Sequence, residues 1–286
     1  MSNYQKMMRK LISHPKSGIK MLRRMTDRHR KCCVKCGTIG CLQVHSKDRN
    51  GVLTYECQAC KKTFVETYGT IFYRSKIPIS KWLLGIIFWV TATGSISAAD
   101  LSRKLGISHI SAWKMLTKIR QKLSNGLGKE LLKGITEADE AWFGKKDNQD
   151  IVLGIVERGR RKIRLIIIPD VKEATLYPHI RKNIEEGSSF FTDSRITYSI
   201  TGVRYHHKTT NHSKGEFALP GGIHSNTIEQ IWGDIKGIIR TIHHGVSKKY
   251  RALYLAQYAF SYQFKHSTNL FFKTVCQLFN PTYCII

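Results

Sequence analysis

Two pairs of closely spaced cysteines constrain the fold of this chain more than any other feature. Two residues separate Cys33 from Cys36, two separate Cys57 from Cys60, and twenty lie between the pairs. Four thiolates at this spacing can close a tetrahedral site of the kind that zinc occupies. Because four protein ligands leave no open coordination position, we expect a structural Zn2+ that organises folding and takes no part in catalysis.

Other readings of these cysteines stay open. The four thiols could be unrelated buried side chains. Cys32 could replace Cys33, and Cys41 or His45 could serve as a spare ligand. The sequence YECQACKKTF, residues 55–64, is typical of a β-hairpin knuckle. We therefore predict a small zinc-binding module here without fixing every ligand.

The balance of charge predicts a polyanionic partner. The chain holds 47 Lys and Arg residues against 20 Asp and Glu, a formal net charge of +27. Phosphates attract such a field at long range, so DNA or RNA is favoured over a merely cationic surface. The longest apolar run, residues 82–92, is too short to span a bilayer and is typical of a buried helix.

The beginning of the chain bears on its compartment. The first thirty residues are basic but lack the apolar stretch of a secretion signal. We therefore expect an intracellular protein in a reducing compartment, with its eight cysteines as metal ligands or free thiols and not as disulfides. Residues 1–31 predict either a mobile basic arm or a short helical region.

A pair of short helices is predicted after the apolar helix at residues 79–93. The first covers Ala98 to Leu105, Gly106 breaks the pattern, and Ser108 can cap the second. In a basic chain beside a zinc module this indicates a helix-turn-helix, although an ordinary α-hairpin is the alternative. The predicted DNA-facing residues are Ser108, His109, Ser111 and Lys114, with Trp113 and Leu116 packing inward.

From Gly134 onward the pattern is that of a mixed α/β fold. Short β-rich runs occupy residues 134–144, 150–159, 162–170 and 188–194. A helix is predicted at 175–187, with Pro178 in its first turn or at a kink. Loop-like sequence follows to Gly222, and helices are expected at 225–240 and 248–266. Together they predict an α/β sheet covered by helices.

The composition also suggests how the chain divides into modules. The sequence SNGLGKE, residues 124–130, is typical of a linker. We expect five parts: a basic segment at 1–31, a zinc ribbon at 32–75, a helix-turn-helix at 76–125, a catalytic domain at 134–270 and a C-terminal tail at 271–286.

Three acids in this basic chain suggest metal-dependent phosphodiester chemistry. Asp139 lies in the first predicted strand, Asp193 ends the fourth, and Glu229 follows Asp193 after an interval of thirty-five residues on a predicted helix. Two divalent ions can hold the attacking and leaving oxygens of a phosphodiester in line, and carboxylates suit Mg2+. Lys236 lies two helical turns beyond Glu229 on the same face, whereas Asp234 is expected to be solvated.

The start of that helix allows a second interpretation. Asn226 and Glu229 are three residues apart, so both can face one site. Taken alone, this stretch favours a capping box, with Asn226 as the N-cap residue and Glu229 at the third helical position. The two upstream aspartates and Lys236 favour a shared site instead. Since a Glu neutralises more metal charge than an Asn, we expect Glu229 to be the ligand and Asn226 to assist.

The motifs in combination resemble a family. The order CVKC, CQACKKTF, LSRKLGISHISAWKMLTKIR, ADEAWFG, FTDSRITY, NHSKGEF and HSNTIEQIWGDIKG is similar to that of an insertion-sequence group of DDE transposases with an N-terminal zinc ribbon and helix-turn-helix. These are the ISXO2-like transposases, whose eukaryotic relatives are the Merlin-like elements. The resemblance covers residues 33–266. The stretch DEAWFG departs from the Gly-richer, Tyr-containing stretch of many members.

The resemblance implies a ribonuclease H-like catalytic domain, two Mg2+ or Mn2+ ions and cut-and-paste transposition. It selects Asp139 over Glu137 and Glu140, which spacing alone does not. It implies that Asp139, Asp193 and Glu229 bind the catalytic ions and that Lys236 contacts phosphate near the cut end. Asn226 matches a residue proposed in the group as the third active-site residue.

The same resemblance implies partners and location. The zinc module and helix pair would bind double-stranded DNA at terminal inverted repeats, and the catalytic domain would also engage target DNA, as a homodimer or higher assembly. The protein would be DNA-associated, in cytoplasm or nucleoid of a bacterium or in a eukaryotic nucleus. A non-catalytic DNA-binding descendant and a metal-dependent nuclease without strand transfer are the alternatives.

Several other residues are expected to have structural or surface roles. Trp232 is expected to pack in the core or a dimer contact. The histidines before and after the last catalytic helix could position phosphate or shape a loop, but surface or packing roles are equally favoured; they are His206, His207, His212, His224, His243 and His244.

Overall fold

The computed structural model describes residues 3–26, 32–124, 130–193, 204–210, 222, 224–264 and 269–279. The chain divides into two compact units. Unit 1 contains residues 1–126 and 266–286, and unit 2 contains residues 127–265. The two are described separately below.

Unit 1 begins with two amphipathic helices, α1 (Asn3–Ser13) and α2 (Ser17–Thr26). Their apolar side chains Leu11, Ile19 and Leu22 are buried, and the helices contact α3 (Ile79–Thr91). Most of their basic residues are exposed, as expected for helices that bury one stripe, but Arg23 is partly buried and pairs with the buried Glu66. Of the two predictions for residues 1–31, the helical one therefore holds for the described residues.

A three-stranded antiparallel sheet follows, made of β1 (Leu42–Lys47), β2 (Leu53–Cys57) and β3 (Thr63–Val65). The predicted hairpin forms between β2 and β3, where Tyr55 pairs with Phe64. Its turn carries Lys61 at φ +55°, a left-handed conformation that is uncommon for a residue with a side chain.

The rest of unit 1 is helical. Helices α4 (Ala98–Leu105) and α5 (His109–Ser124) are joined by a turn in which Gly106 has φ +56° and closes α4. Ser97 accepts a hydrogen bond from the backbone of Asp100 and caps α4. Helix α9 (Leu270–Phe279) lies in the segment expected as a tail and contacts α2, α3 and α5. Its buried Leu270, Phe271, Val275 and Leu278 explain why this part of the segment is ordered as a helix.

Unit 2 is a mixed α/β domain built on one five-stranded sheet with the order β6-β5-β4-β7-β8. Strands β4, β7 and β8 run parallel, while β5 and β6 are antiparallel to their neighbours. The strands are β4 (Ile135–Phe143), β5 (Asp150–Glu157), β6 (Lys162–Ile168), β7 (Ser189–Asp193) and β8 (His206–Thr210). A short 3-10 helix, η2 (Lys146–Asn148), joins β4 to β5.

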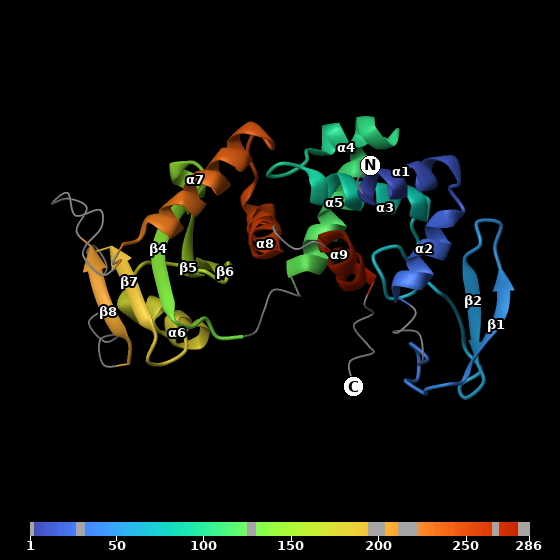
Figure 1. The fold of residues 1–286 in the computed structure, drawn as a ribbon, viewed down its shortest axis with the longest axis horizontal. Helices are drawn as coiled ribbons and strands as arrows, with labels where there is room; N and C mark the ends of the chain where they lie inside the picture. Colours follow the sequence, from blue (N-terminus) through green and yellow to red (C-terminus); the bar gives the residue numbers. More distant parts are fainter. Residues whose placement is uncertain are drawn as a thin grey trace. The chain divides into compact units, whose positions relative to one another are not determined.

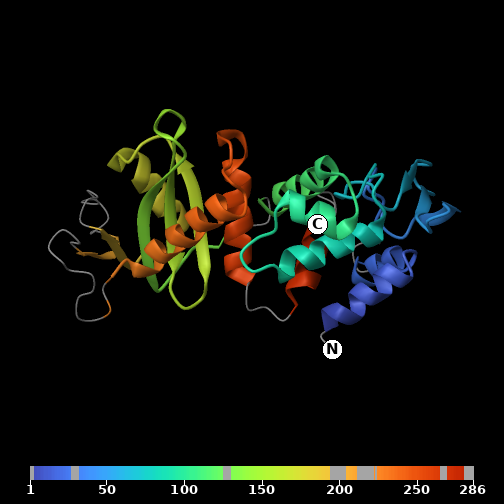
Figure 2. The ribbon, with the colours of Figure 1, turned by 90° about the horizontal axis from the view of Figure 1, so that it is seen from above.

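Helices cover both faces of this sheet. Helix α6 (Glu173–Asn183) packs Leu176 and Ile180 against Ala138 and Phe190 on one face. Helices α7 (Asn226–Thr241) and α8 (Lys248–Phe264) bury their apolar residues on the opposite face, against Val152 and its neighbours. Figures 1 and 2 show α7, in orange, running along the sheet.

Two details of unit 2 differ from the sequence prediction. Pro178 lies inside α6, beyond its first turn. Strand β8 falls in the stretch predicted as loop, because its sequence HHKTT has no alternating apolar residues and it forms the sheet edge beyond β7. Polar edge strands carry little pattern from which a strand can be predicted.

Candidate active site

The strand register brings the first two acids together. Strands β4 and β7 are parallel, with Glu137 opposite Phe191 and Ala138 opposite Thr192. One further step along both strands sets Asp139 beside Asp193, and neighbouring strands are about 4.8 Å apart. Both acids follow the period-two alternation that puts Glu137 and Phe143 on the α7 face. The fold thus brings together two carboxylates that are fifty-four positions apart in the sequence.

Helix α7 adds the third acid. Figures 1 and 2 show α7 alongside β4. Its Ile228 backbone N–H donates to Glu137 Oε2 at 3.0 Å, and one turn later Trp232 Nε1 donates to Asp139 Oδ2 at 2.9 Å. Glu229 lies beside Ile228 on the first turn and is exposed. The helix is therefore anchored to β4 at two points, and Glu229 is set beside that strand.

The electrostatics of Asp139 reflect this convergence. Burial is the main cause that raises the pKa of Asp139, and the charges of Glu229 and Asp193 raise this pKa further. The hydrogen bonds from the Glu140 backbone and from Trp232 act in the opposite direction. A half-buried carboxylate beside two others is stabilised in its charged form by a cation, so this donor set suits a hard divalent ion.

The three acids are not packed as tightly as the cysteines of unit 1. Within the described part of the chain, the cysteine quartet alone brings one ligand atom from each of at least three His, Cys, Asp or Glu residues within 4.8 Å of all the others. A wider spread is compatible with two ions about 4 Å apart, because the outer carboxylates then bind different ions.

The capping box, which was the alternative role for Asn226 and Glu229, does not begin α7. The N-cap residue is Ser225, which makes no side-chain capping bond, and Asn226 is already the first helical residue and exposed. Ser225 Oγ instead donates to Glu229 Oε1 at 3.1 Å. The backbone donor at the third helical position, Ile228, is satisfied by Glu137 from the neighbouring strand. Neither Asn226 nor Glu229 is therefore committed to capping the helix.

Arg158, and the supporting role of Glu137, were not predicted from the sequence, where Glu137 was considered only as an alternative to Asp139. Glu137 is fully buried and pairs with Arg158, which follows β5 directly. Arg158 also donates to the carbonyl oxygens of Gly222 and His224, at 2.6 Å each, and His224 Nδ1 lies 3.6 Å from Glu137 Oε1. This cluster fixes the chain just before α7. The sequence signal for this cluster was a single acid, Glu137, two positions before Asp139 and so on the same face of the strand.

Lys236 continues the same face of α7. It lies one turn after Trp232 and two turns after Glu229, is exposed, and places Nζ 5.8 Å from the Phe143 ring. Asp234, expected to be solvated, is exposed and accepts a hydrogen bond from the Tyr258 hydroxyl at 3.2 Å. Its partner on α8 directs it away from Asp139.

The remaining histidines have varied surroundings. His207 is half-buried and its Nε2 lies 2.9 Å from Thr192 Oγ1, and burial lowers its pKa. His206 is exposed on β8, and His243 packs edge-on against Tyr254. His244 has φ +52°. His212 lies outside the described residues.

In unit 1, the four predicted cysteines form one cluster. One sulfur from each of Cys33, Cys36, Cys57 and Cys60 lies within 4.8 Å of the others, so the group could hold a metal ion. A backbone hydrogen bond from Cys60 is the main cause that lowers the pKa of Cys57 to about 6, and thiolates are the ligands that metals require.

Two neighbouring cysteines lie outside this quartet. Cys41 Sγ is 3.3 Å from Cys57 Sγ, so it is adjacent to the quartet but not part of it. Cys32 is disulfide-bonded, whereas the other described cysteines are free, so the expectation of no disulfides is wrong for Cys32. Because Cys33 supplies the first thiolate, Cys32 is not needed as its replacement.

The predicted DNA-facing residues lie at the start of α5. Ser108, His109 and Lys114 are exposed, and Ser111 is partly exposed. Ser108 Oγ accepts from the Ser111 backbone at 3.2 Å and so caps the helix. Leu116 is buried, while Trp113 is only partly buried. The polar face predicted for this helix is therefore accessible.

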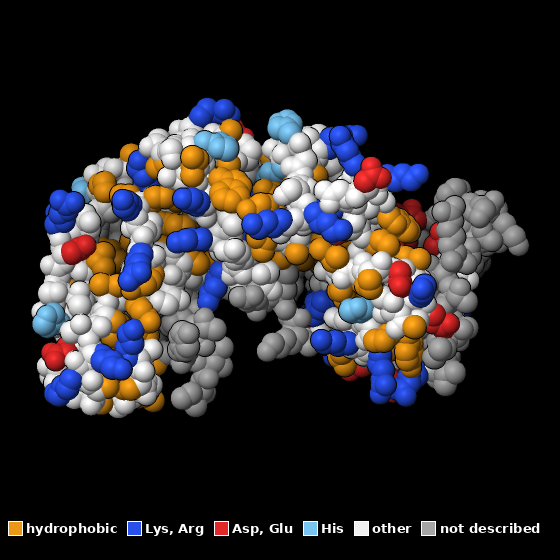
Figure 3. Space-filling model, turned by 180° about the vertical axis from the view of Figure 1, so that it is seen from behind, with side chains coloured by type: hydrophobic (Ala, Val, Ile, Leu, Met, Phe, Trp, Pro, Cys, Tyr) orange, Lys and Arg blue, Asp and Glu red, His pale blue; other side chains and the backbone are white. Residues whose placement is uncertain are grey.

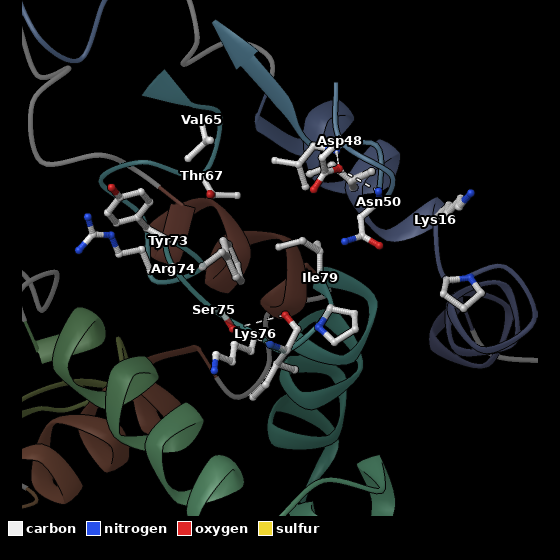
Figure 4. A pocket seen from close by; sticks show the side chains of 16 residues that line it. Lys16, Asp48, Asn50, Val65, Thr67, Tyr73, Arg74, Ser75, Lys76 and Ile79 are labelled. Carbon is white, nitrogen blue, oxygen red and sulfur yellow. Dashed lines mark hydrogen bonds between the residues drawn. The ribbon is translucent and has the colours of Figure 1, made fainter. Parts of the chain in front are cut away.

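Unit 1 also contains a pocket of about 450 Å³. It is formed by α2, the β1–β2 turn and the segment before α3, and Figure 4 shows Lys16 and Arg74 on opposite sides of it. The acids Asp139, Asp193 and Glu229 all belong to unit 2. The pocket and the candidate catalytic residues therefore belong to different units of the chain.

No helix in the described portion of the chain combines the length and apolar character needed to cross a membrane.

Comparisons with known proteins bear on both the site and the fold. The simian T-cell lymphotropic virus intasome, solved by cryoEM in complex with PP2A regulatory subunit B56 gamma, is a structural neighbour with 14% identity and a TM-score of 0.32. The similarity covers 58% of this chain and 64% of the matched chain, which is less than two thirds of its length. A likeness this low supports no inference about the present chain.

Sequence relatives are more informative. An uncharacterized transposase-like protein of Haemophilus influenzae is 30% identical over 97 residues, which are 34% of this chain and 76% of that protein. The model of the ISXO2-like transposase domain matches residues 131–263, a span that lies within unit 2 and contains all three acids. The chain therefore belongs to the ISXO2-like transposase family.

Proposed function

We propose that the protein is an active DDE transposase that cleaves the ends of its element and joins them to target DNA. The observation that carries the proposal is the approach of Asp139 and Asp193 on adjacent parallel strands, with Glu229 on α7 close enough to raise the pKa of Asp139. The sheet order β6-β5-β4-β7-β8, in which β5 alone runs antiparallel to the other four strands, supports a ribonuclease H-like catalytic domain.

Asp139, Asp193 and Glu229 would hold two Mg2+ or Mn2+ ions. Their oxygen donors fit hard divalent cations, as do the burial and, to a smaller extent, the neighbouring acidic charges that raise the pKa of Asp139. When bound, the ions supply Lewis-acid stabilisation of the attacking and leaving oxygens. Asn226 is exposed on the same first turn as Glu229 and assists in orienting the substrate there. Lys236, exposed two turns later, neutralises a phosphate near the cut end.

The chemistry comprises two displacements at phosphorus. In the first, water attacks a phosphodiester at the element end and releases a 3′-hydroxyl and a 5′-phosphate. In the second, that 3′-hydroxyl attacks a target phosphodiester and displaces the target's own 3′-oxygen. The number of phosphodiester bonds is conserved in the second step, so it needs no external energy source. The protein's residues contribute positioning and charge neutralisation to both.

Unit 1 would recognise the DNA. The quartet Cys33, Cys36, Cys57 and Cys60 binds a structural Zn2+, and α4 and α5 act as a helix-turn-helix whose exposed first turn reads the terminal inverted repeats. Figure 3 shows many Lys and Arg side chains on the surface, with acidic side chains among them. With a net charge of +27, this favours double-stranded DNA as partner. Two ends must be joined to one target, so a dimer or larger assembly is proposed.

The test supplies DNA carrying the inverted repeats that flank the gene, with Mg2+ and a supercoiled target plasmid. The expected products are cleaved ends and plasmids with joined ends, and Asp139→Ala and Asp193→Ala should abolish both. Cleavage without joining would indicate a metal-dependent nuclease instead. Binding without cleavage at any Mg2+ or Mn2+ concentration would indicate a non-catalytic DNA-binding relative.

A further inference from the structure

The indole of Trp232 is buried in the core of unit 2 and also forms a hydrogen bond with a candidate catalytic acid. It is 5% exposed and lies edge-on against Phe143, with ring centroids 5.9 Å apart. Its only polar atom, Nε1, donates to Asp139 Oδ2 at 2.9 Å. A buried tryptophan N–H usually finds a partner, but here the partner is one of the three acids of the proposed site.

A glycine makes this contact possible. Gly154 is the cross-strand neighbour of Asp139 in the β4–β5 pair, and it lies in the middle of a buried strand. A Cβ atom at position 154 would lie 2.5 Å from Trp232 Cζ2 and 2.6 Å from Cη2. Glycine in a strand interior weakens the strand and often marks a close approach by another group. At this position the approaching group is the indole.

We propose that Trp232 is a positioning residue for Asp139, and that Gly154 is the opening in the sheet that lets its indole N–H reach the carboxylate. The hydrogen bond fixes one carboxylate oxygen, Oδ2, and with it the rotamer of Asp139. The other oxygen, Oδ1, is then presented in one direction. Hydrogen bonds from neighbouring residues commonly orient metal ligands in this way.

The same contact sets the distance of α7 from β4. Trp232 lies one turn after Glu229 and one turn before Lys236, so the residue that orients Asp139 also fixes the helix that carries the third acid. The inference rests on the proposed function, because it requires Asp139 to bind the catalytic ions. Beyond that function, it requires the indole N–H of Trp232, and not only the bulk of the ring, to strengthen the binding of the ions by Asp139.

The experiment measures Mn2+ binding to the full-length, zinc-loaded protein from the electron paramagnetic resonance signal of free Mn2+. Trp232→Phe keeps an aromatic ring but removes the N–H. We expect about a tenfold higher Kd for the Mn2+ whose binding depends on Asp139, a typical effect of losing a residue that orients a ligand. Trp142→Phe is the matched control, since Trp142 belongs to β4 but lies on the opposite face of the strand from Asp139.

The outcomes separate the two proposals. If Asp139→Ala lowers Mn2+ binding while Trp232→Phe binds as tightly as the unmodified protein, the positioning role is overturned and the proposed function stands. If Asp139→Ala leaves Mn2+ binding unchanged, the proposed function itself fails. A loss of folding stability with an unchanged Kd would also overturn the inference, because it would show that Trp232 acts through packing alone.

A second variant keeps the test decisive if Trp232→Phe does not fold. Phenylalanine lacks the outer ring atoms that approach Gly154, so its substitution leaves a space there. The double variant Gly154→Ala with Trp232→Phe fills part of that space with a methyl group. It is measured in place of the single variant, with the same expected rise in Kd.

Discussion

Glu137 Oε2 accepts a hydrogen bond from the backbone N–H of Ile228 at 3.0 Å. A carboxylate on a strand, ninety-one positions away in the chain, thus provides the acceptor for a backbone N–H in the first turn of α7. Glu137 is fully buried, and its other oxygen pairs with Arg158. A negative charge at a helix N-terminus interacts favourably with the helix dipole. This contact determines where the helix carrying Glu229 begins.

We therefore expect Glu137→Ala to destabilise the protein strongly. The change leaves Arg158 without its buried partner and the Ile228 N–H without an acceptor, a loss on the order of 3 kcal/mol in the free energy of unfolding. Glu137→Gln keeps an oxygen for Ile228 and should cost less. Urea denaturation followed by circular dichroism measures both.

The matched control is Glu130→Gln. Glu130 also pairs with a basic side chain, Lys162, but is largely exposed, and such pairs contribute less than about 1 kcal/mol. If Glu137→Ala unfolds at the same urea concentration as Glu130→Gln, the Glu137 contacts do not hold α7 in place.

The elements of unit 2 with strong apolar patterns were predictable from sequence. Strands β5 and β6 carry branched apolar runs, and α7 was predicted as a helix from its amphipathic pattern. Strand β8 was not, because HHKTT pairs only through its backbone at the sheet edge. Helix α9 was expected as tail, since nothing in LFFKTVCQLF says which surface will bury it.

The three candidate acids could be named from the sequence, whereas the residues that contact them could not. Asp139, Asp193 and Glu229 could be selected by spacing and resemblance. The roles of Glu137, Arg158 and Trp232 depend on contacts between residues from 21 to 93 positions apart, which no local pattern encodes. The local pattern SNTIEQ, taken alone, favoured a capping box, which was the alternative to a ligand role for Glu229. The helix begins differently, because Ser225 is its N-cap residue and Glu137 on β4 accepts from the Ile228 N–H.

The stability of the protein without Mg2+ or Mn2+ should depend on Asp139 and pH. Burial, aided by Glu229 and Asp193, raises the folded-state pKa of Asp139, so between the ordinary and raised values the folded chain binds more protons than the unfolded chain. Stability contributed by Asp139 is thus lost as pH rises through this window. Asp139→Asn, which keeps an oxygen for Trp232, should raise the free energy of unfolding at pH 7.

Urea titrations from pH 7 down to about pH 4 check this prediction. The stabilisation by Asp139→Asn should shrink as pH falls below the raised pKa, because the native carboxyl is then protonated as well. If Asp139→Asn is less stable than the unmodified protein at pH 7, the charged carboxylate of Asp139 does not destabilise the folded protein.

Glu229→Gln and Asn226→Ala distinguish the two candidates for the third ligand. Both residues are exposed on the first turn of α7, and Ser225 donates to Glu229. If Glu229 is the ligand, Glu229→Gln lowers end cleavage by more than about 100-fold, whereas Asn226→Ala lowers it by about tenfold or less. Single-turnover cleavage of labelled element ends measures both rates. The reverse order would assign the third position to Asn226.

The zinc content of cysteine variants should distinguish the zinc ligands of unit 1 from the neighbouring Cys41. Native mass spectrometry is expected to find one Zn2+ per chain in the unmodified protein and in Cys41→Ser, and none in Cys57→Ser. The two thiols are 3.3 Å apart, but only Cys57 belongs to the quartet. Because four thiolates close the site, removing one should abolish stable binding. Loss of zinc from Cys41→Ser would instead make Cys41 a ligand.

Lys114 provides a test of the DNA-binding face of α5. Its side chain is exposed near the start of the helix, and a lysine that contacts a phosphate releases about one counterion on binding. Lys114→Ala should therefore weaken binding to the inverted repeat and reduce the slope of log K against log salt by about 1. Fluorescence anisotropy across a salt series measures the slope. Lys182→Ala removes an equal charge from the exposed face of α6 and should leave the slope unchanged; equal effects of the two variants would mean that α5 attracts DNA only through net charge.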